Sequence, residues 1–478
     1  MKAKLFLIVN FFLFVSLLFF ILFKVEIKPD GDIVEYYGVT ETVLSHASLN
    51  LRQSDINNLL NYIDAPKFDN PGYYLNGREN NRYPVHFWAY SLLLVPARLG
   101  LELFGFNPLL SLPITNLLIF GLTLYYIYKN FVQKTQQRLL LLGLLFFSPL
   151  IFYFTWPGPD MWYLCLLLIA VFYAFRKHYF QAAFLTALAS WHSQPLVMLA
   201  VLFSALAVYK DWRKMTLVLG AGIVVTVPYI YNLYAFGTLT PWLGLQNAYA
   251  SINGFGLQNI SIWKLFEQFF DLNIGLFWYG SVLILLSAIG IKYFWQERQW
   301  ERLVIVLGFV LTAFFYQTNP AWHYGTTGYG PSRHIIFILP LLICLSLKNW
   351  RQLKGWFFGA VFLICILFQG YSLFFNNYFY PDTTRSLFHT QYAQYFLNNY
   401  PELYNPTPEI FIDRTLNQDT MLPQSAIYEE QGICKKAYIL PNGQFLLKQK
   451  CGFIPKNERI KLKQLENLSI CQGVYVNY

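Results

Sequence analysis

The sequence predicts an all-α membrane protein that crosses the bilayer many times. Of its 478 residues, 56% are hydrophobic and only 13% are charged, whereas a soluble domain has about 25% charged residues. The 45 Phe, 35 Tyr and 13 Trp are too many for a single aqueous core, and several apolar runs approach the length that spans a bilayer. The net charge of +10 does not call for nucleic acid, because Lys and Arg in membrane proteins mainly fix orientation. We therefore expect no nucleic-acid partner.

The first apolar run, residues 5–23, predicts a retained transmembrane helix. Lys2 and Lys4 form a basic start, as in a signal peptide. However, the run is longer than the roughly 7–15 residues of a signal-peptide core, and no small-x-small cleavage motif follows it. We expect this helix to enter from the cytoplasm and to leave Asp30 and Asp32 outside.

Short basic clusters divide the rest of the chain, and the positive-inside rule places them in the cytoplasm. Each consecutive pair of clusters must then enclose an even number of crossings. The crossings expected after the first lie at 108–128, in pairs within 138–176 and 177–210, and near 215–235, 273–291, 303–318, 334–347 and 355–377. The sequence thus predicts about eleven membrane crossings, a cytoplasmic N-terminus and an extracytoplasmic C-terminus.

Residues 85–104 are also long enough to cross, but counting them would move the basic residues 129–138 outside. Pro96, Arg98 and Glu102 suit a helix that lies in the membrane interface better than one that crosses lipid. We therefore expect residues 25–107 to form one large external loop with interfacial helices.

The chain changes character near residue 381, which predicts a transmembrane domain at 1–380 and a small external α+β domain at 381–478. Residues 405–415 predict a turn followed by a strand. Residues 434–451 predict a hairpin centred on Asn442-Gly443. Such a hairpin would place Cys434 opposite Cys451 within disulfide reach, although Pro441 cannot donate the hydrogen bond next to the turn. Three free thiols, with Cys471 as the third, are the alternative; an oxidising compartment favours the disulfide.

The predicted topology gathers the unusual polar residues on the outer face of the membrane. They are Asp30, Asp32, Glu35, Arg78, Arg82, His86, Asp160, His192, His323, Arg333 and His334. We expect a cleft in which carboxylates face cations. Such a cleft suits group transfer from an anionic lipid donor, because cations stabilise a phosphate leaving group and a carboxylate can accept the proton of an acceptor hydroxyl. The lipid tail would lie between helices.

Several of these residues also have a structural interpretation. Asp30 and Asp32 can anchor the chain in the interface, and Asp160 can cap the next helix. Arg333 can reach the interface from a helix end. His192 is more simply a satisfied polar residue at a helix break. The functional hypothesis depends on their sharing one face.

The order of several motifs resembles the bacterial polytopic glycosyltransferases of the GT-C fold, such as the protein mannosyltransferases and the aminoarabinose transferase of lipid A. The motifs are GDIVEYYGVTETVL (31–44), RYPVHFWAYSLLLVPARL (82–99), SPLIFYFTWPGPDMW (148–162), YNLYAFGTLTP (231–241) and WHYGTTGYGPSRHIIFILP (322–340). The resemblance implies transfer of a sugar, with inversion, from a polyprenyl-phosphate-linked donor to a glycan, lipid or protein acceptor on the outer face of the bacterial cytoplasmic membrane.

By position in these motifs, Asp32 would be the general base and Asp160 a second carboxylate. Arg333 would hold the donor phosphate, with Arg82, His86 or His334 assisting. The adjacent Asp-Glu pair usual in the family is replaced by Asp32-Ile33, so Asp30 remains an alternative base. Some members of the fold use a divalent metal and others do not, so a metal is left open.

Other functions remain open from the sequence. A polymerase or ligase that uses a lipid-linked oligosaccharide would need a similar outer cleft. A flippase for lipid-linked glycans would need polar residues at the membrane midplane or inverted repeats, and the sequence has neither. A membrane-anchored binding protein would place its function in residues 381–478.

Overall fold

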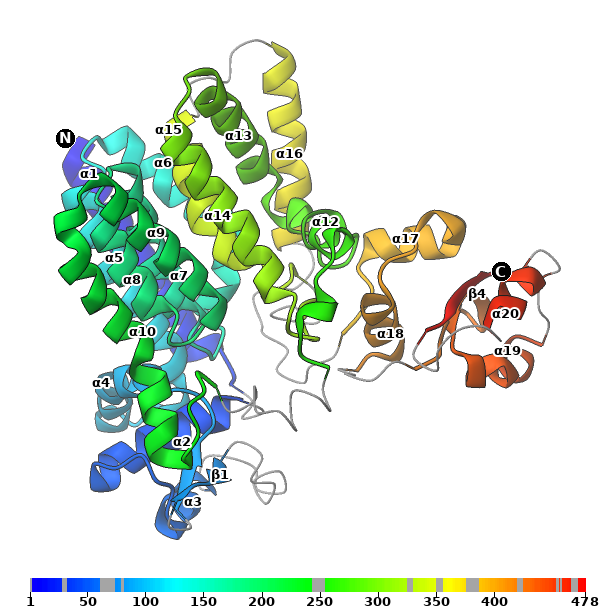
Figure 1. Cartoon of the computed structure of the whole chain (residues 1–478), viewed down its shortest axis with the longest axis horizontal. Coiled ribbons are helices and arrows are strands. Elements are labelled where there is room, and N and C mark those ends of the chain that lie inside the picture. The colour runs from blue at the N-terminus through cyan, green and yellow to red at the C-terminus, as the bar shows by residue number, and fades with distance from the viewer. Residues whose placement is uncertain are drawn as a thin grey trace.

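The computed structural model describes residues 2–27, 32–60, 74–78, 81–242, 254–324, 330–349, 356–374, 387–418, 424–452, 455, 458–465 and 472–478. Within these residues the chain is mostly helical. A bundle of helices makes up most of the molecule, and a smaller unit with a three-stranded sheet follows near the C-terminus (Figure 1). The predicted boundary at 380/381 lies outside the described residues.

Every segment for which the sequence predicts a crossing contains a helix. These helices are α1 (Lys2–Lys24), α5 (Ser111–Asn130), α6 (Thr135–Phe146), α7 (Asp160–Phe175), α8 (Tyr179–Ala189), α9 (Val197–Lys210), α10 (Met215–Phe236), α13 (Leu276–Gln296), α14 (Trp300–Tyr316), α15 (Leu339–Asn349) and α16 (Trp356–Phe374). Among the described residues, 3 stretches are long and apolar enough to cross a membrane, namely Pro108–Asn130, Trp212–Phe236 and Leu276–Gln296. These stretches indicate a membrane protein, and the number of crossings remains a prediction.

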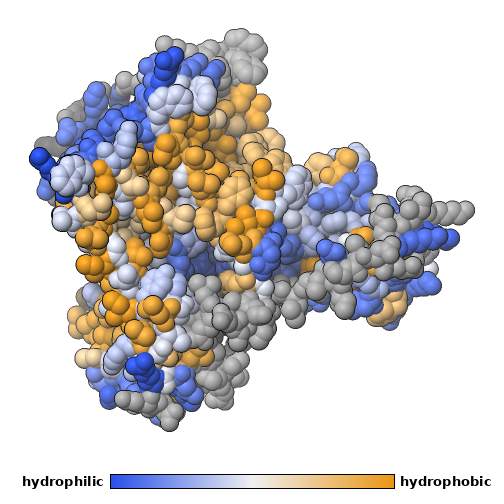
Figure 2. Space-filling view, viewed as in Figure 1, coloured by the Kyte–Doolittle hydropathy of each residue, from blue (hydrophilic) through white to orange (hydrophobic). Residues whose placement is uncertain are grey.

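The surface of the bundle supports contact with lipid. Hydrophobic residues cover much of the bundle in this view, whereas hydrophilic residues predominate at its upper end and over the C-terminal unit (Figure 2). On α10, Leu219, Ile223 and Ile230 are exposed. A broad apolar face of this kind is unfavourable in water but not in a bilayer.

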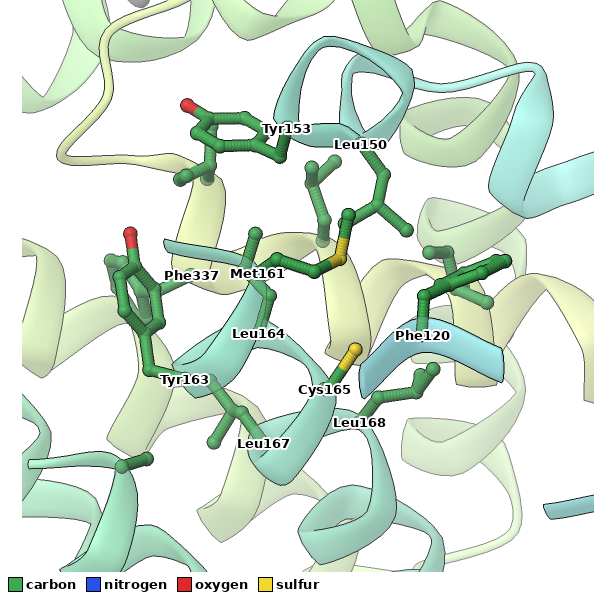
Figure 3. Packing of buried hydrophobic residues seen from close by; sticks show 14 of the residues in the cluster. Phe120, Leu150, Tyr153, Met161, Tyr163, Leu164, Cys165, Leu167, Leu168 and Phe337 are labelled. Atoms are coloured by element: carbon green, nitrogen blue, oxygen red, sulfur yellow. The ribbon is translucent and has the colours of Figure 1, made fainter. Parts of the chain in front are cut away.

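Helix α7 packs at the centre of the bundle. Met161, Leu164 and Leu168 are spaced to lie on one face of α7, and all three are buried, with Phe120 of α5 nearby (Figure 3). Since α7 begins at Asp160, this packing also fixes the position of Asp160 at its N-terminal end.

The predicted external loop folds into short elements. They are α2 (Asp32–His46), α3 (Gln53–Leu60), α4 (Ala89–Leu103) and an antiparallel pair of strands, β1 (Tyr74–Asn76) and β2 (Arg82–Pro84). Arg98 of α4 is buried, and its Nε donates to Glu41 at 2.5 Å and to the Tyr37 hydroxyl at 2.9 Å. Its Nη1 donates to Glu102 at 2.8 Å. Carboxylates of the protein therefore neutralise the charge of Arg98, one of the residues for which no crossing was expected at 85–104. The bonds of Arg98 to Glu41 and Tyr37 also join α4 to α2.

The C-terminal unit combines helices with an antiparallel sheet in the order β3-β4-β5. Its elements are α17 (Gln391–Asn399), α18 (Pro408–Leu416), β3 (Ala426–Glu430), β4 (Ile433–Ile439), α19 (Gln444–Cys451), α20 (Arg459–Gln464) and β5 (Val474–Asn477). The unit contacts α12 (Ile262–Phe270), where Lys264 forms an ion pair of 2.8 Å with Glu409.

The strand predicted within 405–415 is wrong, because these residues form α18 instead. Pro408 occupies the first turn of the helix, where its fixed φ is favourable and its missing N–H costs nothing. Glu409 in the same turn complements the helix dipole. Ile410 and Phe411, whose side chains suggested a strand, are buried on the helix.

The structure contains the predicted disulfide between Cys434 and Cys451, whose Cα atoms are 5.7 Å apart. The predicted hairpin is wrong, however. Pro441 starts a short 3-10 helix, and the chain continues into α19 rather than into a second strand. Leu447 of α19 packs against β4, and this brings Cys451, at the end of α19, back to Cys434.

Candidate functional site

Polar side chains from several distant segments meet at the N-terminal end of α7. The segments are the start of α2, residues 86–90, the turn between α8 and α9, and residues 332–334. Arg333 lies within electrostatic reach of Asp160 and Asp32, and His86 lies within reach of Asp32, Glu35 and Arg333. The structure therefore brings together much of the charged cluster expected from the sequence.

Asp160, which is buried, and Arg333, which is half-buried, form the centre of this cluster. The side chain of Asp160 is 0% exposed. Its Oδ1 accepts hydrogen bonds from the Tyr163 hydroxyl at 2.8 Å and from Arg333 Nε at 3.2 Å. Its Oδ2 accepts one from Trp156 Nε1 at 2.6 Å, and the Arg333 guanidinium also lies 5.7 Å from the centre of the Trp156 ring. With both oxygens engaged, Asp160 is suited to holding Arg333 in place.

Arg333 keeps hydrogen-bonding capacity for a ligand. Its side chain is 31% exposed, and no described residue accepts a hydrogen bond from its Nη groups. Burial alone would lower the pKa of Arg333, but the charges of Asp160 and Asp32 outweigh burial and raise it. A fixed guanidinium with unused Nη donors is well suited to bind phosphate oxygens.

Glu35 and His86 form a second pair beside Arg333. Glu35 is buried on α2, where its Oε1 accepts the backbone N–H of His86 at 2.6 Å. Its Oε2 lies 2.7 Å from His86 Nδ1. Burial alone would lower the pKa of His86, but the negative charges of Glu35 and Asp32 and the hydrogen bond to Glu35 raise it to about 9. His86 is therefore a second cation at neutral pH, and no described residue bonds to its Nε2.

The Glu35–His86 pair should stabilise the fold at neutral pH, and this stabilisation should be lost at alkaline pH. The pKa of His86 is higher in the fold, at about 9, than the ordinary 6.5. The contribution of His86 to the free energy of unfolding is therefore complete below pH 6.5 and is lost as the pH rises through 9. Between pH 7 and 10 we expect a loss of up to about 3 kcal/mol, seen as a falling thermal unfolding midpoint. The loss should be smaller in His86→Gln; parallel curves for the two proteins would contradict a contribution from the pair.

Aromatic and amide side chains that the sequence did not single out support the cluster. The Tyr36 ring lies 5.9 Å from the ring of His86, 5.5 Å from that of Tyr90 and 6.2 Å from that of His192. The buried Asn116 of α5 accepts a hydrogen bond from the Tyr90 hydroxyl at 2.9 Å and donates to the Trp156 carbonyl at 2.7 Å. The signal available in the sequence was an Asn inside an apolar helix, a type of position that is commonly functional.

His192 takes a structural rather than a cationic position. His192 Nε2 accepts the backbone N–H of Tyr90 at 3.1 Å. Burial, with the charge of His86, lowers the pKa of His192 to about 3. His192 is therefore neutral at pH 7, which favours its structural interpretation. The backbone N–H of His334 donates to Ser332 Oγ at 3.2 Å, and its role as a phosphate ligand stays a prediction.

Three other predicted residues lie apart from the cluster or cannot be placed. Arg82 is exposed on β2, and no described residue forms an ion pair with it. The His323 ring is hydrogen-bonded to Asp413 of α18 at 2.8 Å, so it faces the C-terminal unit. Asp30 lies outside the described residues. The structure thus supports His86 over Arg82 as the partner of Arg333.

The part of the chain that the structure describes contains no group of three or more His, Cys, Asp or Glu side chains arranged to hold a metal ion. No known protein family, curated protein or solved structure matches the chain. What the fold and the site define is a helical protein with membrane-length helices and a buried site in which cations adjoin carboxylates. The function must therefore be inferred from this site and from the motifs in the sequence.

Proposed function

We propose that the protein is a glycosyltransferase that moves a sugar from a polyprenyl-phosphate donor to an acceptor on the outer face of the bacterial cytoplasmic membrane. One observation carries the proposal. Arg333, held by Asp160, lies within electrostatic reach of both Asp32 and the His86–Glu35 pair. A phosphate-binding cation next to an acidic side chain is what transfer from a lipid phosphate to a hydroxyl requires.

In this proposal Arg333 and His86 bind the donor phosphate. The Arg333 Nη groups and His86 Nε2 have no hydrogen-bond partner among the described residues and can donate to phosphate oxygens. As the bond between the sugar and the phosphate breaks, its electron pair moves to the phosphate, and two fixed cations stabilise the charge that develops there. Glu35 orients His86 and Asp160 orients Arg333.

Asp32 acts as the general base. It is the first residue of α2 and is partly buried. Its carboxylate takes the proton of the acceptor hydroxyl while that oxygen attacks the anomeric carbon from the face opposite the phosphate. One carbon–oxygen bond forms as the other breaks, and the configuration at the sugar is inverted.

Lipid analysis of a deletion strain tests the function directly. If the protein uses a polyprenyl-phosphate monosaccharide, this lipid should accumulate when the gene is deleted, and an envelope glycan, lipid or protein should lack one sugar. Mass spectrometry would identify both species. Unchanged lipid-linked sugars in the deletion strain would contradict the proposal. Movement of a lipid-linked glycan across liposomes that contain the purified protein and no acceptor would indicate a flippase instead.

A further inference from the structure

Residues 321–324 and 330–334 form the two arms of the turn that carries Arg333. The first arm is in direct contact with the C-terminal unit. Nε2 of His323 lies 2.8 Å from Oδ2 of Asp413 on α18, and both side chains are almost fully buried, at 3% and 0% exposed. Next to this pair, Trp322 forms a buried apolar cluster with Ile274 and with Ile410 of the same helix. The first arm of the turn is thus held by a buried polar contact and an apolar one.

The two arms of this turn are joined by hydrogen bonds. The Ser332 hydroxyl donates to the Trp322 carbonyl, and the backbone N–H of Arg333 donates to the Tyr324 carbonyl at 2.6 Å. His323 lies between Trp322 and Tyr324 in the chain. A displacement of His323 would therefore move the backbone of Arg333.

A second connection reaches the other arm from a different part of the C-terminal unit. The Tyr404 hydroxyl donates to Asp271 Oδ2 at 2.7 Å, and Asp271 Oδ1 accepts the backbone N–H of Ile274 at 3.0 Å. The Ile274 carbonyl accepts the backbone N–H of Ser332 at 3.0 Å. This chain of hydrogen bonds ends one residue before Arg333.

Loss of either connection should be costly locally. A buried donor or acceptor that loses its partner costs more than an exposed one, because water does not replace the bond. His323 would lose its buried hydrogen-bond partner if Asp413 were replaced. Asp271 would lose one of its partners if the Tyr404 hydroxyl were removed. The turn can regain hydrogen bonds to water only by shifting, and such a shift would displace the Arg333 guanidinium from Asp160.

We infer that the C-terminal unit positions the phosphate-binding turn, with Asp413 and Tyr404 as positioning residues for Arg333. The inference rests on the proposed function insofar as Arg333 binds phosphate. It assigns the C-terminal unit a role in preorganising the donor site. The two connections start from different residues of the C-terminal unit and converge on adjacent residues, which distinguishes positioning from simple attachment of the unit to the bundle.

The test uses the full-length protein in lipid nanodiscs, with Asp413→Ala and Tyr404→Phe as separate variants. Hydrogen exchange of the Ser332 and Arg333 amides reports the turn, and titration with polyprenyl phosphate reports the site. In each variant we expect exchange of these amides to rise roughly tenfold or more and polyprenyl phosphate to bind about tenfold more weakly. Asp413→Asn keeps an oxygen acceptor for His323. Its amide exchange rates and its affinity for polyprenyl phosphate should therefore lie between those of Asp413→Ala and wild type.

Glu402→Gln is the matched control, because Glu402 is an exposed carboxylate of the same unit and should leave both measurements unchanged. Wild-type exchange at Ser332 and Arg333 in both Asp413→Ala and Tyr404→Phe would overturn the inference. Faster exchange in the variants of a protein that does not bind polyprenyl phosphate would uphold the structural connection and contradict the proposed function.

Discussion

Replacement of Asp32 by asparagine should lower kcat for sugar transfer by roughly 10²–10⁴-fold, the usual contribution of a general base. Asparagine has nearly the same shape but cannot accept the proton of the acceptor hydroxyl. Because Arg333 and His86 remain in place, binding of the donor should change much less than kcat. Initial rates of polyprenyl-phosphate release, measured over a range of donor concentrations, separate the two effects.

Glu26→Gln provides a matched control for this variant. Glu26 is an exposed carboxylate between α1 and α2, so its replacement removes the same charge nearby without touching the cluster, and activity should be retained. If Asp32→Asn transfers sugar at the wild-type rate, Asp32 is not the base. Asp30→Asn would then test the alternative left open by the sequence motif.

Replacement of Arg333 by alanine should reduce kcat/KM by roughly 10²–10³-fold, in line with the loss of one donor that stabilises developing charge. Unlike Asp32→Asn, this variant should also weaken donor binding, since the phosphate is present before and after the bond breaks. Lysine restores the charge but cannot both bond Asp160 and offer a fork of donors to phosphate. Arg333→Lys should therefore recover only part of the activity. Donor titration and steady-state rates on the same samples measure both effects.

Arg82→Ala controls for the loss of a positive charge on the same side of the predicted membrane. The sequence placed Arg82 and Arg333 together as phosphate ligands, but Arg82 is exposed on β2. We expect Arg82→Ala to keep wild-type donor binding. A larger loss in Arg82→Ala than in Arg333→Ala would contradict the assignment of the phosphate site.

Much of the fold could be predicted because its signal is local. Apolar runs bounded by basic clusters locate the helices of the bundle, and a helix satisfies its backbone hydrogen bonds within one segment. Predictions failed where local preference and packing disagree. Residues 410–412 are Ile-Phe-Ile, which favours a strand, yet Pro408 begins α18 there. The Asn442-Gly443 signal was similarly overridden by Pro441 and by the packing of α19 on β4.

The types of polar residue available to the site, and their order along the chain, can be read from the sequence alone. The partners of these residues cannot, because hydrogen bonds depend on distances between segments far apart in the chain. Asp160 and Arg333 are separated by 173 positions in the chain. His323 is hydrogen-bonded to Asp413 of the C-terminal unit rather than to a residue of the cluster. The histidines show the physical reason most clearly. His86 and His192 start from the same ordinary pKa, yet the carboxylates beside His86 raise its pKa to about 9, and burial without such a neighbour lowers that of His192 to about 3.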